Sequence, residues 1–552
     1  MPALSSRRDF LRRTGLVALA APLAATAIEG CANVAATTSN KASLLRVGWT
    51  IEPDSMNPLT AYSTEADEIL ALVYDNLMHY SIELKPEPGL ATSWTYSDDG
   101  KSITYKLRSG VSWHDGKPFT AADAKFTFET IAKEQLGSYD QWVSQLTSAQ
   151  APDDHTLVLN FSAPQAFNPG LAVPILPQHI WQGMKASEVQ KFTNAHPVGT
   201  GPYTFVSWNK GQSVTIKRNE QWWGTKPAAE KISWILFGNE DVMAQNLRTG
   251  AVDICPEVPP TIWDGLAGAQ HVKTVEMESF SFHHIGINVS DNPKSGGNPL
   301  LKDRNVRLAL SYAVDRQKLV DVALAGHGIP GSVLLPSGFG AWHLDIPAAE
   351  QLNANPAKAG QVLDAAGYKL RGGSKVRTNA AGKPLSFRLI AIESTSVDVA
   401  AAQIFRDACA AVGIQLTLTT LDANSLGNTV YNADAPNWDI FVWGWDSGVY
   451  DPDYMLGIPL SSQIGGNNDV YYADKHYDAL YGQQAAEIDA AKRLAMVHQT
   501  QQYYYDAASY IVMWYQSKLQ AYRTDTWTGW TPLTGGIILN FTRDNYLNAR
   551  PV

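Results

Sequence analysis

One run near the middle of the chain is Asp303-Arg304-Asn305-Val306-Arg307-Leu308-Ala309-Leu310-Ser311-Tyr312-Ala313-Val314-Asp315-Arg316. Its apolar residues recur at helical spacing, which predicts a helix with one face in a core. The residues that we expect in that core are Leu308, Ala309, Tyr312 and Ala313. Arg307 and Arg316 flank them, so the run indicates scaffold rather than a functional site.

The composition sets outer limits on fold and function. The chain has 552 residues, of which 45% are hydrophobic, and this length predicts about three structural units. A formal net charge of -10 disfavours nucleic acids and anionic membrane surfaces as partners, because both attract basic patches. The 17 Trp and 23 Tyr suit a core and also suit stacking on a ligand.

The N-terminus has the features of an export signal. Ser6-Arg7-Arg8-Asp9-Phe10-Leu11 is a twin-arginine signature, and the apolar run 15–28 after it is too short to span a bilayer. Ile28-Glu29-Gly30-Cys31 resembles a lipoprotein processing box, in which the cysteine is lipidated. We therefore expect a signal peptide at 1–31, lipidation of Cys31, a flexible tether at 32–43, and a protein held outside the cytoplasm by its lipid alone.

Further motifs follow one another on both sides of the central run. They are Ala91-Thr-Ser-Trp94, Ser97-Asp-Asp-Gly100, Leu107 to Gly116, Thr120-Ala-Ala-Asp123, Pro197 to Tyr203 with Gly-Thr-Gly-Pro-Tyr, Asn219 to Trp223, Leu247-Arg-Thr-Gly250-Ala-Val-Asp253, and Asn355 to Tyr368. In this order they resemble the extracellular solute-binding proteins of peptide-type ABC importers, solute-binding family 5. The resemblance covers about residues 44 to 545. In the motif that ends at Asp253, Gly250 closes a helix, where glycine can take a positive φ.

The resemblance implies an α/β, two-lobe periplasmic-binding-protein fold with a hinged cleft and an extra subdomain in the first lobe. The first lobe would cover 44–285, with the subdomain at about 75–190; the second would cover 286–515, and 516–552 would return to the first. Chain crossings at 283–289 and 513–523 would form the hinge, and the lobes would close on a ligand. The implied partners are a small solute and an ABC permease and ATPase complex; we expect a monomer with no cofactor.

The candidate binding site is the segment 441–453. Trp438-Asp439-Ile440 predicts a buried strand that leads into a turn, and the Gly- and Pro-broken segment after it holds aromatic and acidic residues that suit a ligand. In the resembling family this is where the second lobe meets the ligand. The contacts that we expect are Trp443, Trp445 and Asp446 from the second lobe, Trp49, Met56 and Asn57 from the first, and Trp514 and Tyr515 on the floor.

The sequence indicates the class of ligand less directly than it indicates the fold. Peptide-binding members of the family pair an aspartate with the peptide's terminal ammonium, and the segment that carries it ends much like Asp451-Pro452-Asp453. That aspartate aligns with Gly448 here, and Asp446 is the acid that could replace it. Short peptides are the first expectation, oligosaccharides or other uncharged polyols the second, and other solutes the third.

The other motifs in the sequence are weaker evidence for a functional site. Gly326 to Gly331 fits G-x-G-x-x-G but follows a predicted helix and contains Pro330, so it predicts a loop. His283 and His284 would face opposite sides of a strand and would not chelate a metal together. Packing is the simpler interpretation of Cys255, Cys409, Trp222-Trp223 and Tyr503-Tyr504-Tyr505. The sequence offers no convincing nucleophile–base pair, so we expect a binding protein and no enzyme; a sensory or chaperone-like adaptor on the same fold stays open.

Overall fold

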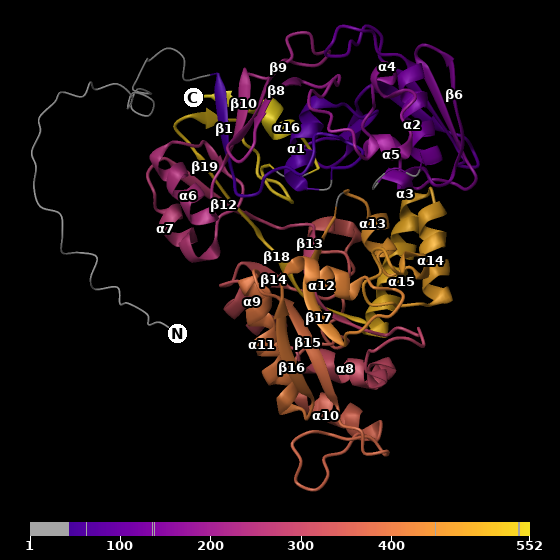
Figure 1. Ribbon diagram of the computed structural model, residues 1–552, viewed down its shortest axis with the longest axis vertical. Coiled ribbons are helices and arrows are strands. Elements are labelled where there is room, and N and C mark those ends of the chain that lie inside the picture. Colours follow the sequence, from indigo (N-terminus) through magenta and orange to yellow (C-terminus); the bar gives the residue numbers. More distant parts are fainter. Residues whose placement is uncertain (1–42, 62, 135, 137–138, 448, 539–540) are drawn as a thin grey trace, which may run out of the picture. The chain divides into compact units, whose positions relative to one another are not determined.

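The computed structural model describes residues 43–552 except 62, 135, 137–138, 448 and 539–540 (Figure 1). The predicted signal peptide, Cys31, the tether up to residue 42 and the Gly448 position therefore lie outside the described residues. No helix in the described part of the chain is long and apolar enough to cross a membrane.

The first sheet is built on β1 (Leu44–Trp49), where buried Leu45 and Val47 alternate with more exposed neighbours in the period of a strand. Its other strands are β8 (Tyr203–Asn209), β9 (Ser213–Arg218), β10 (Lys231–Leu236), β11 (Ile254–Cys255), β12 (Val272–Met277) and β19 (Lys518–Arg523). Their order is β12-β19-β11-β1-β10-β9-β8. The helices of this part are α1 (Thr64–Val73), α6 (Glu240–Thr249), α7 (Trp263–Ala267) and α16 (Asp544–Asn548).

The motif that ends at Asp253 ties α6 to this sheet. Gly250 has φ 81° at the end of α6, which confirms the expected left-handed cap. The Arg46 guanidinium of β1 donates to the Gly250 carbonyl oxygen at 2.8 Å and pairs with Asp253 at 2.7 Å. The motif is therefore scaffold.

A second, antiparallel sheet lies in the chain between β1 and β8. Its strands are β4 (Ala91–Tyr96), β5 (Ser102–Leu107), β6 (Leu146–Asp153) and β7 (Thr156–Phe161), in the order β4-β5-β7-β6. The same part of the chain contains the helices α2 (Ala121–Glu134), α3 (Asp140–Val143), α4 (Gln178–Trp181) and α5 (Ala186–Val189). It also contains the paired strands β2 (Met78–Tyr80) and β3 (Pro86–Pro88). At the start of α2, the Thr120 N–H donates to the Asp123 carboxylate at 3.0 Å, the acid version of a capping box.

A third sheet has the order β14-β18-β13-β17-β15-β16. Its strands are β13 (Ser281–Ile287), β14 (Gly328–Pro330), β15 (Ser386–Ile392), β16 (Gln415–Leu421), β17 (Ile440–Asp446) and β18 (Tyr510–Gln516). Its helices are α8 (Arg304–Ala313), α9 (Arg316–Ala323), α10 (Pro356–Ala365), α11 (Ser396–Ala411), α12 (Ala423–Val430), α13 (Pro452–Gly457), α14 (Lys475–Ala486) and α15 (Ala490–Ala507). Short 3-10 turns are η2 (Pro169–Leu171), η3 (Pro260–Ile262), η4 (Pro299–Lys302), η5 (Ser337–Trp342) and η6 (Ser461–Gln463), and β20 (Trp527–Thr528) pairs with β21 (Arg550–Pro551). We call the part on the seven-stranded sheet, together with the four-stranded sheet and the β2–β3 pair, the first lobe, and the part on this sheet the second.

The chain passes between these sheets twice. β12 ends at Met277 in the first lobe and β13 begins at Ser281 in the second, while β18 ends at Gln516 and β19 begins at Lys518. The first passage thus precedes the segment 283–289 expected as a crossing. That segment overlaps β13, which is paired on both edges, with β17 and with β18.

The central sequence run forms α8, a turn and the start of α9. Ala309, Tyr312 and Ala313 are buried as expected, whereas Leu308 is only partly buried. The side chain of Arg316 is buried and donates to the Val512 carbonyl oxygen of β18 at 2.8 Å. Arg316 therefore links α9 to the sheet, as expected of a residue with a structural role.

Candidate ligand-binding site

The carboxyl-terminal half of β17 projects past its neighbour β15. The parallel register between the two strands ends at Ala391 and Val442. From Trp443 to Asp446, β13 is the only strand paired with β17 among the described residues. The expected turn after residue 440 was wrong, because Trp443, Trp445 and Asp446 are still part of the strand. Ligands of open α/β sheets bind beyond such carboxyl ends.

Trp443 and Trp445 lie on one face of β17 and share one buried acceptor. Their indole N–H groups donate to the same carboxylate oxygen of Asp469, at 2.8 and 3.0 Å. Asp469 is fully buried and also accepts a hydrogen bond from the Tyr510 hydroxyl. Both tryptophans remain half-buried, and the Trp443 ring stacks on Tyr431 with centroids 5.4 Å apart. Their rings are thus held in fixed orientations with part of each surface uncovered.

Gly444, between the two tryptophans, makes room for His283 of β13. A Cβ atom at Gly444 would stand 2.8 Å from the His283 ring. That ring is itself held, since it pairs with Asp398 at 2.8 Å and stacks on Trp514 with centroids 5.2 Å apart. Neighbouring His284 instead faces Asp469, at 3.4 Å, so the two histidines point apart as expected. Among the described residues, no cluster of ligating side chains could hold a metal ion.

Asp446 ends β17 with an exposed side chain. Within the described residues, no hydrogen bond or ion pair engages its carboxylate. The charge acts on Tyr454, whose pKa is raised first by burial and then by Asp446. Asp446 is therefore an open acid at the end of the strand that carries the two fixed aromatic rings.

The loop after β17 touches the first lobe. The Tyr80 hydroxyl of β2 donates to the Tyr450 carbonyl oxygen at 3.2 Å, and the two rings meet edge to face at 6.1 Å. Val449 packs with Trp142 and Phe167 in a small apolar cluster. The end of β17 thus lies next to a place where both lobes meet.

Asp451, Pro452 and Asp453 belong to the scaffold of this loop. Arg493 of α15 donates two hydrogen bonds to the Asp451 carboxylate, at 2.8 and 2.6 Å. Asp451 also caps α13, because its carboxylate accepts from the Asp453 N–H at 2.9 Å. Burial raises the pKa of Asp453, and the charge of Asp451 raises it further. These acids therefore hold the loop in place.

Five other residues expected at the site are buried in this structure. Trp49 packs on Trp234 with centroids 5.3 Å apart. The Asn57 amide donates to the carbonyl oxygens of Val189 and Phe192, at 2.8 and 2.9 Å. The five are Trp49, Met56, Asn57, Trp514 and Tyr515, each at most 3% exposed. In this arrangement they are part of the protein's interior, and their contact with a ligand stays a prediction.

Asp67 of α1 is a residue that the sequence analysis did not single out. Its side chain is exposed to solvent, yet its pKa is raised to about 7 by surrounding protein, with further contributions from Asp54 and Glu65. Its charge in turn acts on Tyr139, which packs against the Trp142–Phe167–Val449 cluster. An accessible acid with many protein neighbours is typical of a concave wall, and no sequence pattern marks it.

Asp67 predicts a pH dependence of stability. Its folded-state pKa of about 7 exceeds its ordinary value of 3.8, so the folded state favours the protonated acid. The resulting cost to folding is absent below pH 4 or so and complete above pH 7 or so. We expect Asp67→Asn to raise the free energy of unfolding more at pH 8 than at pH 4.5, measured by urea denaturation. Asp241→Asn, an exposed acid in the first turn of α6, is the matched control, and an equal gain at both pH values would contradict the prediction.

Comparison with known proteins places this chain in a wider group. Residues 85–467 match the family described as bacterial extracellular solute-binding proteins, family 5. The chain is 30% identical over 444 residues to Protein XP55 of Streptomyces lividans, covering 78% of this chain and 76% of that one. It is 28% identical over 453 residues to the oligopeptide-binding protein AppA of Bacillus subtilis, covering 79% of each. The solved structure of that AppA with a nonapeptide matches with a TM-score of 0.77 at 24% identity, over 92% of this chain and 99% of the other.

Proposed function

Because the chain belongs to family 5 of the bacterial extracellular solute-binding proteins, we propose that it is the receptor of an ABC importer for short peptides. The lobes at about 44–285 with 516–552, and at 286–515, would close on the peptide and deliver it to a membrane permease driven by its ATPase. The name of its relative AppA, an oligopeptide-binding protein, supports peptides as the ligand class. Within this proposal the receptor acts as a monomer and performs no catalysis.

The observation that carries the proposal is the end of β17. Trp443 and Trp445 are fixed through Asp469 with part of their surface uncovered, and Asp446 at the end of the same strand has an open carboxylate. Aromatic faces can bury the apolar side chains of a peptide, and an acid can pair with its terminal ammonium. Since position 448 is glycine, we assign ammonium binding to Asp446.

Oligosaccharides are the second candidate, and the tryptophan pair is what favours them. Two indole rings on one strand face, held by a common acceptor, form a rigid platform on which sugar rings could stack. A sugar ligand would have no use for the charge of Asp446, so the two candidates differ in what they require of that residue.

A thermal-shift screen of residues 44–552 against peptide and oligosaccharide libraries tests the function. A ligand that binds the native state raises the melting temperature in a concentration-dependent way. We expect short peptides with a free terminal ammonium to give the shift and their N-acetylated forms to give much less. Shifts with sugars alone would replace the first candidate by the second.

Asp446→Asn gives a sharper test of the site. The change removes one charge from an exposed position, so the fold should keep its stability. We expect the variant to bind a free peptide about tenfold more weakly or worse, because a charge-assisted hydrogen bond contributes about 1.5–3 kcal/mol. Isothermal titration would measure the loss, with Asp434→Asn, an exposed acid of the same lobe, as control. An unchanged dissociation constant would remove Asp446 from the site.

Export and anchoring complete the proposal. The twin-arginine signature at Ser6 to Leu11 and the processing box at Ile28 to Cys31 support export and lipidation of Cys31. We expect the wild-type chain to take up radiolabelled palmitate and to fractionate with membranes. A Cys31→Ser variant should lose the label and leave the membrane fraction; an unlabelled wild-type chain would argue against the anchor.

A further inference from the structure

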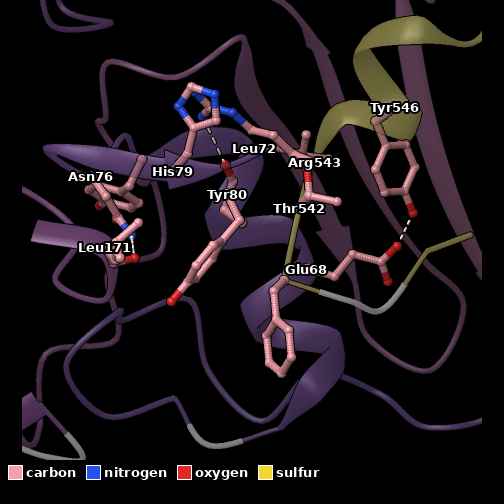
Figure 2. Close-up of a pocket in the computed structure, with 12 residues that line it drawn as sticks. Glu68, Leu72, Asn76, His79, Tyr80, Leu171, Thr542, Arg543 and Tyr546 are labelled. Carbon is pink, nitrogen blue, oxygen red and sulfur yellow. Dashed lines mark hydrogen bonds between the residues drawn. The ribbon is translucent and has the colours of Figure 1, made fainter. Parts of the chain in front are cut away.

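A pocket of about 110 Å³ lies in the first lobe, on the side of α1 that faces the C-terminal segment (Figure 2). Its walls come from α1, the β2 region, η2 and residues 541–546. Ala71, Leu72, Leu171 and Phe541 supply apolar surface, and Tyr80 adds its ring. None of the eight residues expected at the ligand site lines it, so the pocket is separate from the end of β17.

Three polar atoms of residues that line the pocket have no hydrogen-bond partner in the described structure: Arg543 Nε, His79 Nδ1 and Glu68 Oε2. Arg543 pairs with Asp75 at 2.6 Å through one terminal nitrogen and donates to the Ala71 carbonyl oxygen at 3.2 Å through the other. Its Nε–H, which is buried, has no acceptor. His79 approaches Arg543 from β2 (Figure 2), and its buried Nδ1 is also unpartnered. Such buried polar atoms are costly to leave unmatched, which indicates that a polar occupant belongs here.

The charge of Arg543 is matched within the protein, and burial disfavours the charged forms of His79 and Glu68. The Arg543 cation is neutralised by fully buried Asp75. Burial, followed by the charge of Arg543, lowers the pKa of His79 to about 4, so its ring is neutral. Glu68 forms a hydrogen bond with the Tyr546 hydroxyl, and burial raises its pKa well above the ordinary value, although the Trp234 and Trp49 indoles oppose the shift. A charged guest would therefore lose its hydration and find no counter-charge.

We propose that this pocket is a second binding site, for a small uncharged solute that carries a donor and an acceptor side by side, as a primary amide does. The amide oxygen would accept from the Arg543 Nε–H. The amide nitrogen would donate to His79 Nδ1, with the ring proton on Nε2, which lies 3.7 Å from the Glu87 carboxylate. The apolar part of the solute would contact Leu171 and Phe541.

The site stands beside the contact between the lobes. Tyr80, which forms part of the pocket wall, is the residue whose hydroxyl donates to Tyr450 of the second lobe. Phe541 also lies near Tyr450, with ring centroids 6.3 Å apart. An occupant would therefore press on the same rings that touch the second lobe. The inference rests on the pocket alone and does not depend on which solute binds at β17.

Three isosteric probes test the charge assignment: acetamide, acetate and the acetamidinium cation. Saturation-transfer NMR on residues 44–552 would compare their binding at pH 7.5. Ala71 is exposed on α1 and lines the pocket, so Ala71→Leu should fill it without disturbing the helix. Ala122→Leu, the same change at an exposed position of α2, is the control. His79→Leu removes the acceptor for the amide nitrogen.

We expect saturable binding of acetamide and clearly weaker binding of both ions. Ala71→Leu should abolish acetamide binding, Ala122→Leu should leave it intact, and His79→Leu should weaken it about threefold to tenfold. Absence of saturable acetamide binding to the wild-type protein would overturn the proposal. Preference for either ion, or acetamide binding that survives Ala71→Leu, would overturn it as well.

Discussion

Asp469→Ala is expected to cost about 3–5 kcal/mol of stability and to abolish tight binding of the ligand. The lost carboxylate is fully buried and accepts from the Trp443 and Trp445 indoles and from the Tyr510 hydroxyl. Removing it leaves three donors without an acceptor and frees both tryptophan rings. Urea denaturation would measure the stability, and the near-ultraviolet circular dichroism of the folded variant would report on the rings.

Tyr510→Phe is the matched control for this prediction. It removes one donor and keeps the carboxylate for both indoles, so a cost of about 0.5–1.5 kcal/mol is expected. Ligand affinity should fall far less than in Asp469→Ala. Equal losses in the two variants would mean that Asp469 does not hold the tryptophans in their working orientation.

Asp469 also shows why the site could be only partly anticipated from the sequence. The aromatic and acidic residues at 441–453 marked this segment as a candidate, but the glycine and proline there suggested an early turn. The strand continues because Asp469, more than twenty residues further along, holds Trp443 and Trp445, and because Gly444 fits against His283. No local pattern encodes such distant partners.

The scaffold was easier to predict, because its signals are local. Gly250, at a left-handed helix end, acts on residues near it in the chain. The residue pairs that decide burial are remote. Trp49 and Trp234 pack together, and the amide of Asn57 binds carbonyl groups near residue 190. An aromatic or amide side chain near a strand end is therefore as compatible with a core as with a ligand contact, and the sequence alone does not separate the two.

Arg493→Met is the second change for which we expect a large effect. Arg493 and Asp451 lie 42 residues apart in sequence, and their side chains are 7% and 11% exposed. Removing the cation leaves the Asp451 carboxylate buried without a counter-charge, with Asp453 beside it. Breaking such a pair costs about 3–5 kcal/mol. The loop with Val449 and Tyr450 should then lose its fixed position, so peptide affinity should fall together with stability.

A second substitution separates the lost charge pair from lost packing. Asn caps a helix about as well as Asp, so Asp451→Asn keeps the start of α13 while removing the unpaired charge. The double variant Asp451→Asn/Arg493→Met should therefore recover much of the stability lost in Arg493→Met.

The pKa of Asp453 is already raised by burial and by Asp451, and Arg493 opposes that shift. Without Arg493, protonation of Asp453 should restore part of the stability, so the deficit of the single variant should shrink as the pH falls from 8 to 5. A deficit that does not change with pH, or a double variant as unstable as the single one, would show that Arg493 acts through packing on Trp342 and not through its charge.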